Sequence, residues 1–404
     1  MKTIVAFCIL LVSIPAIGQV INQIGYYNVN GVTGLAAQDN YMFLSDGKIL
    51  DNSIPSSPQL VSQFSFNGDG INVIIDDEFA YFGTGMTNEF YIADISNINF
   101  PLQFGYLEFT EGNGVFGMDV IENTLMAALG MDGTIVSIDI MDKTNPEILD
   151  ILNIPGGQCR DVVINGNLAY AAHATGLKVI DITIPSDLQV INSIGGGYNS
   201  IDMGDGKVFL GKSSGGIDVF DIDEPENPTP AFAITNTGGT AWDIKYSEQH
   251  IYLATNSDGL FIYKEEDNIG IFKANFPNEG NGQSFSVALQ DSFILLSGLV
   301  NGVAILQYDS TGIVGINEIS NDQGFKIYPN PAQNEIFISS DNELQISEIN
   351  IYNQLGQNVI HQPACRQAGN RYEGSIDVSS LMPGIYFVEV VIGNDRIREK
   401  VVIK

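Results

Sequence analysis

Apolar and polar positions alternate along residues 19–310 in a pattern that recurs about every 40 to 45 residues. Each copy has a short apolar run that usually ends in Asp, preceded by a second apolar run that contains a turn. Alternation with a period of two is typical of β-strands. The seven runs are GKILDN (47–52), YIADIS (91–96), VSIDIM (136–141), LKVIDI (177–182), IDVFDI (217–222), LFIYKE (260–265) and VAILQY (303–308).

The turns between the paired runs contain NG, DG, DD, EN or QD at one equivalent place. Asn, Asp and Gly tolerate the positive φ that tight hairpins need. A further apolar segment follows several copies, so each unit of about 42 residues holds three or four strands. This pattern predicts the blades of a seven-bladed β-propeller, and residues 20–28 would close the ring by supplying the strand that the last copy lacks.

Two segments of these repeats, residues 176–194 and 216–230, have the form x-V-x-D-I followed by a turn that contains Pro. They resemble the LVIVD repeat family of secreted bacterial propellers. The resemblance spans roughly residues 20–310 and implies the fold but no single activity. Copies six and seven depart from the pattern, with Lys264 and Gln307 where the other copies have Asp.

The Asp residue that ends the repeated run occurs in five copies. Because a catalytic or metal-binding acid is needed only once, we expect these carboxylates to accept backbone N–H groups and set the following turn. They are Asp51, Asp94, Asp139, Asp181 and Asp221.

The composition changes after Tyr308, where residues 311–324 have the Gly, Asn and Ser content of a linker. Seven short alternating segments then follow in residues 325–404, which predicts a small immunoglobulin-like β-sandwich. The whole chain is therefore expected to be all-β.

The segments YPNPAQNEIFI, INIYNQLGQNV, IDVSSLMPGIYFVEV and KVVIK follow one another within residues 325–404. They resemble the type A C-terminal sorting domain of the type IX secretion system. The resemblance implies passage through the periplasm, recognition by outer-membrane secretion machinery, and a final location outside the cell or on its surface. The residues that match the family's motifs include Tyr328, Pro329, Asn330, Pro331, Gly384, Lys400 and Lys404.

The first 18 residues have the features of a signal peptide: Lys2, an apolar run over residues 4–14, and a small-residue ending. No later stretch is long and apolar enough to predict a membrane span. Cys159 and Cys365 fall in different predicted domains, so no disulfide framework is expected within either domain, and Cys159 is expected to be a small buried residue.

Negative charge is concentrated in residues 19–324, which hold 39 Asp or Glu against 9 Lys or Arg. A nucleic-acid partner is excluded, because phosphate binding needs basic patches. Solubility explains an acidic surface, and structural calcium at acidic loops such as residues 67–70 is the alternative. No other cofactor is expected: His173, His250 and His361 are the only histidines, and the sequence has no HExxH, cysteine cluster or G-x-S-x-G motif.

Ligands of propellers usually meet the mouth of the central channel, so we aligned the inner strands of the seven repeats. A strictly apolar column forms the core: Leu35, Val73, Met118, Val162, Ile201, Ile244 and Val287. The two columns before it are variable. They contain Thr33, Ile71, Phe116, Arg160, Asn199, Trp242 and Phe285, and then Gly34, Asn72, Gly117, Asp161, Ser200, Asp243 and Ser286.

The variable columns suggest three interpretations of the channel mouth. Polar residues that solvate a water-filled channel explain the pattern without any ligand. A binding or scaffold module would use Trp242 and Phe116 as stacking surfaces for a glycan or protein ligand, with Asp161, Asp243, Arg160 and Asn72 as polar groups. A secreted hydrolase or lyase would use the paired acids for chemistry on a polysaccharide or peptide.

Overall fold

The computed structural model describes residues 20–235, 237–278, 283–298, 302–309, 325–329, 331–340, 346–353, 358–363, 373–381, 384–392 and 395–404. These residues form strands and no helix. The chain divides into two compact units, residues 1–313 and 314–404. The predicted signal peptide and linker lie outside the described residues, and so do Asn330 and Cys365.

The described strands of the first unit form seven four-stranded antiparallel sheets, six of them built from consecutive strands. The first three are β2 to β5 (Leu35–Gln38, Tyr41–Leu44, Lys48–Asp51, Gln59–Gln63), β6 to β9 (Gly70–Asp76, Phe79–Thr84, Glu89–Asp94, Leu102–Glu108) and β10 to β13 (Gly117–Ile121, Thr124–Ala128, Thr134–Asp139, Glu147–Asn153). The next three are β14 to β17 (Cys159–Asn165, Leu168–His173, Gly176–Asp181, Gln189–Ile194), β18 to β21 (Tyr198–Gly204, Lys207–Lys212, Ile217–Asp221, Thr229–Ile234) and β22 to β25 (Ala241–Ser247, His250–Thr255, Gly259–Glu266, Ile269–Phe276).

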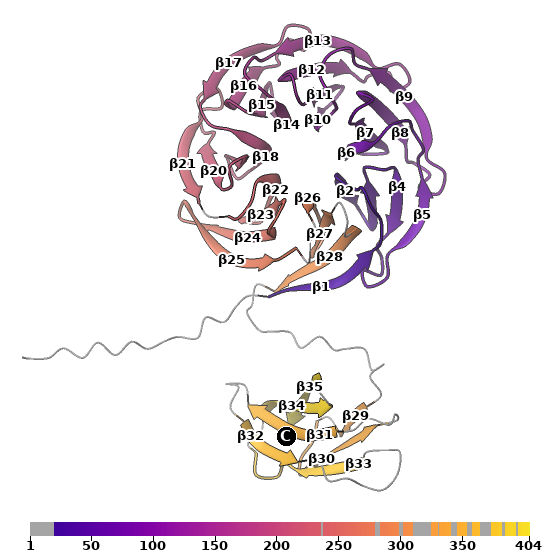
Figure 1. Ribbon diagram of the computed structural model, residues 1–404, viewed down its shortest axis with the longest axis vertical. Coiled ribbons are helices and arrows are strands. Elements are labelled where there is room, and N and C mark those ends of the chain that lie inside the picture. The colour runs from indigo at the N-terminus through magenta and orange to yellow at the C-terminus, as the bar shows by residue number, and fades with distance from the viewer. Residues whose placement is uncertain are drawn as a thin grey trace, which may run out of the picture. The chain divides into compact units, whose positions relative to one another are not determined.

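The seventh sheet joins the two ends of the propeller sequence. It contains β26 (Ser284–Gln290), β27 (Phe293–Gly298) and β28 (Gly302–Asp309), and its outer strand is β1 (Val20–Tyr27), which pairs antiparallel with β28. The predicted closure of the ring is thus confirmed. Figure 1 shows the sheets in a circle, with the first strand of each of the six consecutive sheets innermost. Every inner strand contacts the inner strands of both neighbouring sheets, and β26 meets β2.

The core lies between neighbouring sheets. All seven residues of the predicted apolar column are buried, from Leu35 to Val287, which confirms that prediction. Cys159 is also fully buried, and burial raises the pKa of its thiol, so the cysteine behaves as a small core residue rather than as a nucleophile.

The turns are as the sequence predicts. Positive φ angles occur inside the hairpins, for example at Asp77 (50°), Glu122 (53°) and Asp291 (50°). Four of the repeated carboxylates accept the N–H two residues ahead. They are Asp51, Asp94, Asp139 and Asp181, with oxygen to nitrogen distances of 2.8, 2.9, 2.8 and 2.9 Å. Asp221 instead forms an ion pair with Lys207 at 3.7 Å.

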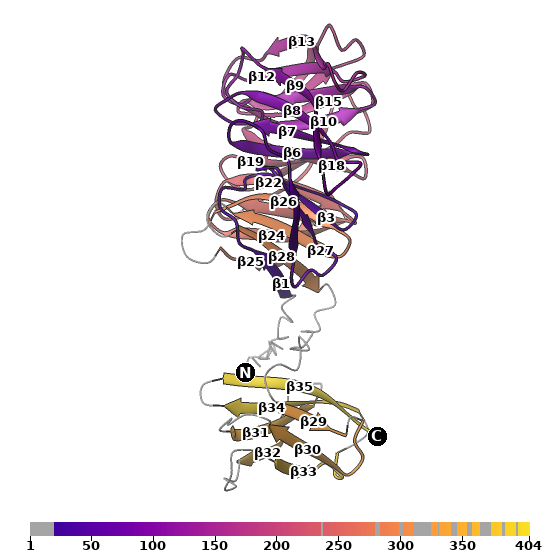
Figure 2. The same cartoon turned by 90° about the vertical axis from the view of Figure 1, so that its right-hand side faces the viewer.

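The second unit is a sandwich of two sheets, whose strands are labelled in Figure 2. One sheet has the order β29 (Phe325–Tyr328), β30 (Glu335–Ser340), β33 (Glu373–Asp377). The other has the order β32 (Asn358–Pro363), β31 (Ile346–Asn353), β34 (Gly384–Ile392), β35 (Asp395–Ile403). Alternate residues of both sheets, such as Ile338, Ile351 and Val388, share one buried cluster, as expected of a sandwich core.

Candidate functional site

A β-bulge recurs at the start of the inner strand in five sheets. In each of them one residue is skipped in the pairing with the next strand: Ile71, Arg160, Asn199, Trp242 and Phe285. A bulge inserts an unpaired residue, so two consecutive side chains can face the same side of the strand. This explains why two adjacent sequence columns, rather than one, reach the channel.

The bulges surround a cavity of about 530 Å³ at the channel. All six predicted ligand-binding residues line it: Asn72, Phe116, Arg160, Asp161, Trp242 and Asp243. The rest of the two variable columns lines it as well, except Gly117 and Ser200. The structure therefore brings the candidate residues together in one place, whereas their role in binding stays a prediction.

Arg160 is held between two aromatic rings on the wall of this cavity. The guanidinium carbon lies 5.1 Å from the centroid of Phe116 and 4.8 Å from that of Trp242, and Nε donates to Gln158 Oε1 at 2.6 Å. Phe285 extends the aromatic surface, with its centroid 5.2 Å from that of Trp242. Cation–π contacts of this kind fix the plane of the guanidinium.

Two polar atoms at the mouth are left without partners. Among the described residues no group pairs with the buried Nε1 of Trp242 or with the buried Oδ1 of Asn72, although Asn72 Nδ2 donates to the carbonyl of Phe116 at 2.8 Å. Leaving a buried donor unpaired costs about 1 to 3 kcal/mol. Among the described residues, Trp242 is therefore held by the contacts of its ring with Arg160 and Phe285 and not by a hydrogen bond of its Nε1.

The two predicted acids hold neighbouring sheets together. Asp161 accepts the N–H of Val162 in its own strand and the N–H of Ile201 in β18, both at 3.0 Å. Asp243 makes the corresponding bond to Val287 in β26 at 2.9 Å. Because the carboxylate oxygens are engaged by backbone groups, each acid connects two blades, which is a structural role that the sequence columns do not reveal.

Two other acids connect neighbouring blades in the same way, two residues further along the inner strands. Asp119 accepts the N–H of Ile164 at 2.7 Å, and Asp202 accepts that of Tyr246 at 2.6 Å. Lys245 lies in the field of all four carboxylates, and their charges raise the pKa of its amine despite its burial. Sequence reasoning missed this second layer. The signal was available, because Asp119 and Asp202 lie two positions after Gly117 and Ser200 of the aligned column, on the same face of their strands.

Burial raises the pKa of Asp161 to about 7, and the charge of Asp243 adds to this effect, whereas Lys245 and the two backbone hydrogen bonds oppose it. Burial also raises the pKa of Asp119 and Asp202. The channel therefore contains several carboxylates around a single ammonium group, and at least one of them titrates near neutral pH.

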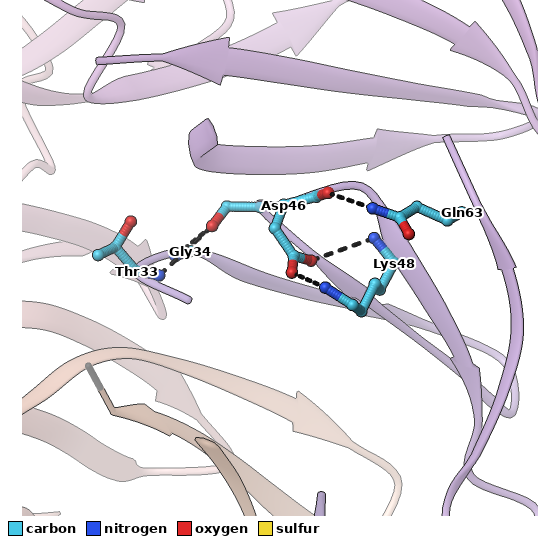
Figure 3. Close-up of polar contacts among 6 residues, drawn as sticks. Thr33, Gly34, Asp46, Lys48 and Gln63 are labelled. Atoms are coloured by element: carbon cyan, nitrogen blue, oxygen red, sulfur yellow. Dashed lines mark hydrogen bonds and ion pairs between the residues drawn. The ribbon is translucent and has the colours of Figure 1, made fainter. Parts of the chain in front are cut away.

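Thr33 and Gly34 of the first blade line the same cavity, and Figure 3 shows the polar contacts next to them. The N–H groups of Thr33 and Gly34 share Ser45 Oγ, at 3.3 and 3.2 Å. Next to Ser45, Asp46 pairs with Lys48. The Ser45 hydroxyl thus holds the backbone of Thr33 and Gly34, the two residues of this group that line the cavity.

No group of three or more His, Cys, Asp or Glu side chains that could hold a metal ion occurs in the part of the chain that the structure describes. In the loop at residues 67–70, Asp69 Oδ1 accepts the N–H of Met86 at 3.1 Å. Calcium at this loop stays a prediction. His173 is buried away from the cavity, with Nδ1 2.9 Å from Thr175 Oγ1.

The geometry of the first unit defines a β-propeller, and comparisons with known proteins agree. Residues 156–194 and 238–263 match the LVIVD repeat. Similar solved structures include the WD40 repeats of RRP9 (TM-score 0.57, 10% identity, 72% of this chain and 97% of that chain) and a chain of a mitotic checkpoint complex (0.55, 11%, 76% and 97%). The computationally designed Ika8 protein is similar too (0.53, 12%, 72% and 100%). At such identities the likeness shows the fold alone.

Residues 326–404 match the family described as the secretion system C-terminal sorting domain. This match indicates export by the type IX secretion system to the cell surface or beyond. No curated protein matches the chain in a sequence comparison. A search of the described residues for a helix able to cross a membrane finds none.

The described sorting-motif residues lie on the strands of the sandwich, in the connection between β29 and β30, or directly after β35. Tyr328 is exposed and stacks on Phe337 at 5.7 Å, and Pro329 and Pro331 are also exposed. Gly384 pairs with Ile403. The terminal Lys404 donates its N–H to the carbonyl of Ala332 at 2.8 Å, so the C-terminus is tied to the start of the domain. Lys400 pairs through its backbone with Phe387.

Proposed function

We propose that the exported propeller is a binding module, secreted or displayed on the cell surface, and that its ligand docks at the channel mouth. The observation that supports this proposal is the aromatic surface within one cavity: Phe116 and Trp242 contact Arg160, and Phe285 contacts Trp242. Aromatic faces next to a few polar groups are typical of binding sites for glycans and peptides.

The hydrolase or lyase alternative has one observation in its favour, the pKa of Asp161 near 7, which suits a general acid. Against it, the carboxylate oxygens of Asp161 and Asp243 already accept hydrogen bonds from backbone N–H groups of two blades. An acid in this position is poorly placed to exchange protons with a substrate. We therefore prefer binding over catalysis.

Glycan and peptide arrays probed with the mature chain test the proposal. We expect Trp242→Ala to lose the signal, because the variant removes the central ring of the aromatic surface. Phe100→Ala removes an exposed ring outside the cavity and is the matched control. Equal binding by all three proteins would contradict the proposed site.

Ligands identified on the arrays are then incubated with the protein, and chain length is followed by mass spectrometry. The binding proposal expects an intact ligand. Turnover that is lost in Asp161→Asn and Asp243→Asn would establish the enzyme instead.

A further inference from the structure

Arg160 is the only arginine in the first 365 residues, and Trp242 is the only tryptophan in the chain. The two residues lie 82 positions apart in the sequence, yet they stack on each other at the channel mouth. The cavity is also lined by Lys245, but four carboxylates lie around that ammonium group, whereas Arg160 lies against aromatic rings.

The charge of Arg160 is not balanced by a side chain of the described residues. Its only hydrogen-bond acceptor there is the neutral amide of Gln158, and no carboxylate of this part of the chain forms an ion pair with it. Burial alone lowers the pKa of the guanidinium. The nearest acid in sequence, Asp161, is turned to backbone N–H groups.

A half-buried guanidinium without a counter-ion is costly, and an anion from outside would offset that cost. The rings of Phe116 and Trp242 cover the guanidinium, while Nε is used by Gln158. The terminal N–H groups remain for a ligand. Two parallel N–H groups match the two oxygens of a carboxylate.

We propose that the channel mouth binds an acidic glycan, with the carboxylate of a uronic-acid unit on Arg160 and the C–H face of a sugar ring on Trp242 and Phe285. This inference rests on the proposed binding function and names its ligand class. A cavity of about 530 Å³ is of the size that small ligands fill, so it accommodates one or two sugar units.

The acidic domain limits how much charge the ligand carries. Residues 19–324 hold 39 acids against 9 basic residues, so a densely charged polyanion is repelled at a distance. A glycan with isolated uronic-acid units, or with one at its end, avoids this repulsion and still supplies the carboxylate that Arg160 lacks.

The single tryptophan gives a direct readout of the mouth. Titration of the mature chain with a uronate-terminated oligosaccharide is expected to change Trp242 fluorescence, and calorimetry gives the affinity independently. The matched ligand is the same oligosaccharide with its carboxyl reduced to an alcohol. Loss of a charge-assisted hydrogen-bond pair predicts about 10- to 100-fold weaker binding of the reduced form.

Arg160→Gln is expected to bind both oligosaccharides equally, and Arg160→Lys to keep only part of the preference, because an ammonium cannot make the two parallel bonds. Lys273→Gln removes one positive charge from the outer strand β25 and should keep the full preference. Thermal melting shows whether each variant is folded. The double comparison of ligand and variant isolates the contact between the carboxylate and Arg160.

Three results would overturn the inference. Tight binding of the reduced oligosaccharide that is lost in Trp242→Ala would support the binding function but contradict the acidic glycan as its ligand. If only peptides with a free C-terminal carboxylate bind and their amides do not, the binding function also stands but the ligand is not an acidic glycan. If no glycan or peptide binds in a way that depends on Trp242, both proposals fail.

Discussion

Arg160 and Asp161 are consecutive in the chain and line the same cavity, yet they make different contacts. The bulge leaves Arg160 unpaired, and its side chain stacks on the rings of Phe116 and Trp242 from other blades. Asp161 resumes the pairing with β15 and accepts N–H groups of two strands. A single inserted residue thus separates the group proposed for binding from the group that holds the ring together.

At the same scale, the raised pKa of Asp161 predicts a pH dependence of stability. The native carboxyl titrates near 7 and the unfolded one near 3.8, so between these values the native state binds more protons. The contribution of Asp161 to stability is therefore present at low pH and is lost as the pH rises through about 7. We expect the free energy of unfolding of the wild type, measured with urea from pH 5.5 to 8.5, to fall more steeply than that of Asp161→Asn.

The control for this experiment is Asp142→Asn. Asp142 is exposed, and hydrogen bonds from Thr144 hold its pKa below its ordinary value, so it does not titrate in this range. Its slope should equal that of the wild type. Equal slopes for Asp161→Asn and the wild type would show that the buried carboxyl keeps an ordinary pKa.

At the scale of the element, β1 decides whether the ring closes. It pairs with β28, the last strand of the propeller sequence, and Gly25 in its middle lies against the loop that follows β4. A Cβ on Gly25 would come within 1.7 Å of the carbonyl oxygen of Pro55. With any larger residue at this position, β1 or the loop must therefore shift.

We predict that Gly25→Val destabilises the propeller by about 1 to 3 kcal/mol, the usual cost of overpacking, because β1 or the loop must shift. Thermal melting measures the loss. Gly195→Val is the control, since a Cβ there meets nothing within 4 Å and the residue is exposed. If Gly25→Val has the same melting temperature as the wild type, the packing of β1 against the loop contributes little to closure of the ring.

At the scale of the whole molecule, the chain divides into two compact units, and each has buried hydrophobic clusters of its own among the described residues. Since the second unit matches the sorting domain, deletion of residues 325–404 is expected to leave the propeller in the periplasm. Cell fractionation with an antibody against the propeller measures this. The complementary fusion of residues 311–404 to a periplasmic reporter should carry the reporter out. Normal appearance of the truncated chain in the medium would contradict the sorting role.

The sequence predicted much of this architecture because its signals are local. Strand alternation, the turn at Asp77 and the carboxylate of Asp181 depend on residues a few positions apart. The candidate columns were found because the repeat aligns equivalent positions of different blades. The acids were interpreted less well: Asp161 and Asp243 suggested ligand chemistry, whereas their partners are backbone groups of the next blade.

The sequence by itself determined the strands, their grouping into repeats, the pairing of the first and last segments, and the sorting domain. Only the tertiary structure decided what the channel residues touch. The contact of Arg160 with Trp242, and the grouping of Asp119, Asp161 and Asp202 around Lys245, join positions 43 to 126 residues apart in different blades. They exist only when the ring is closed and the bulges turn these side chains inward, since no periodicity within one strand specifies its neighbours across a blade boundary.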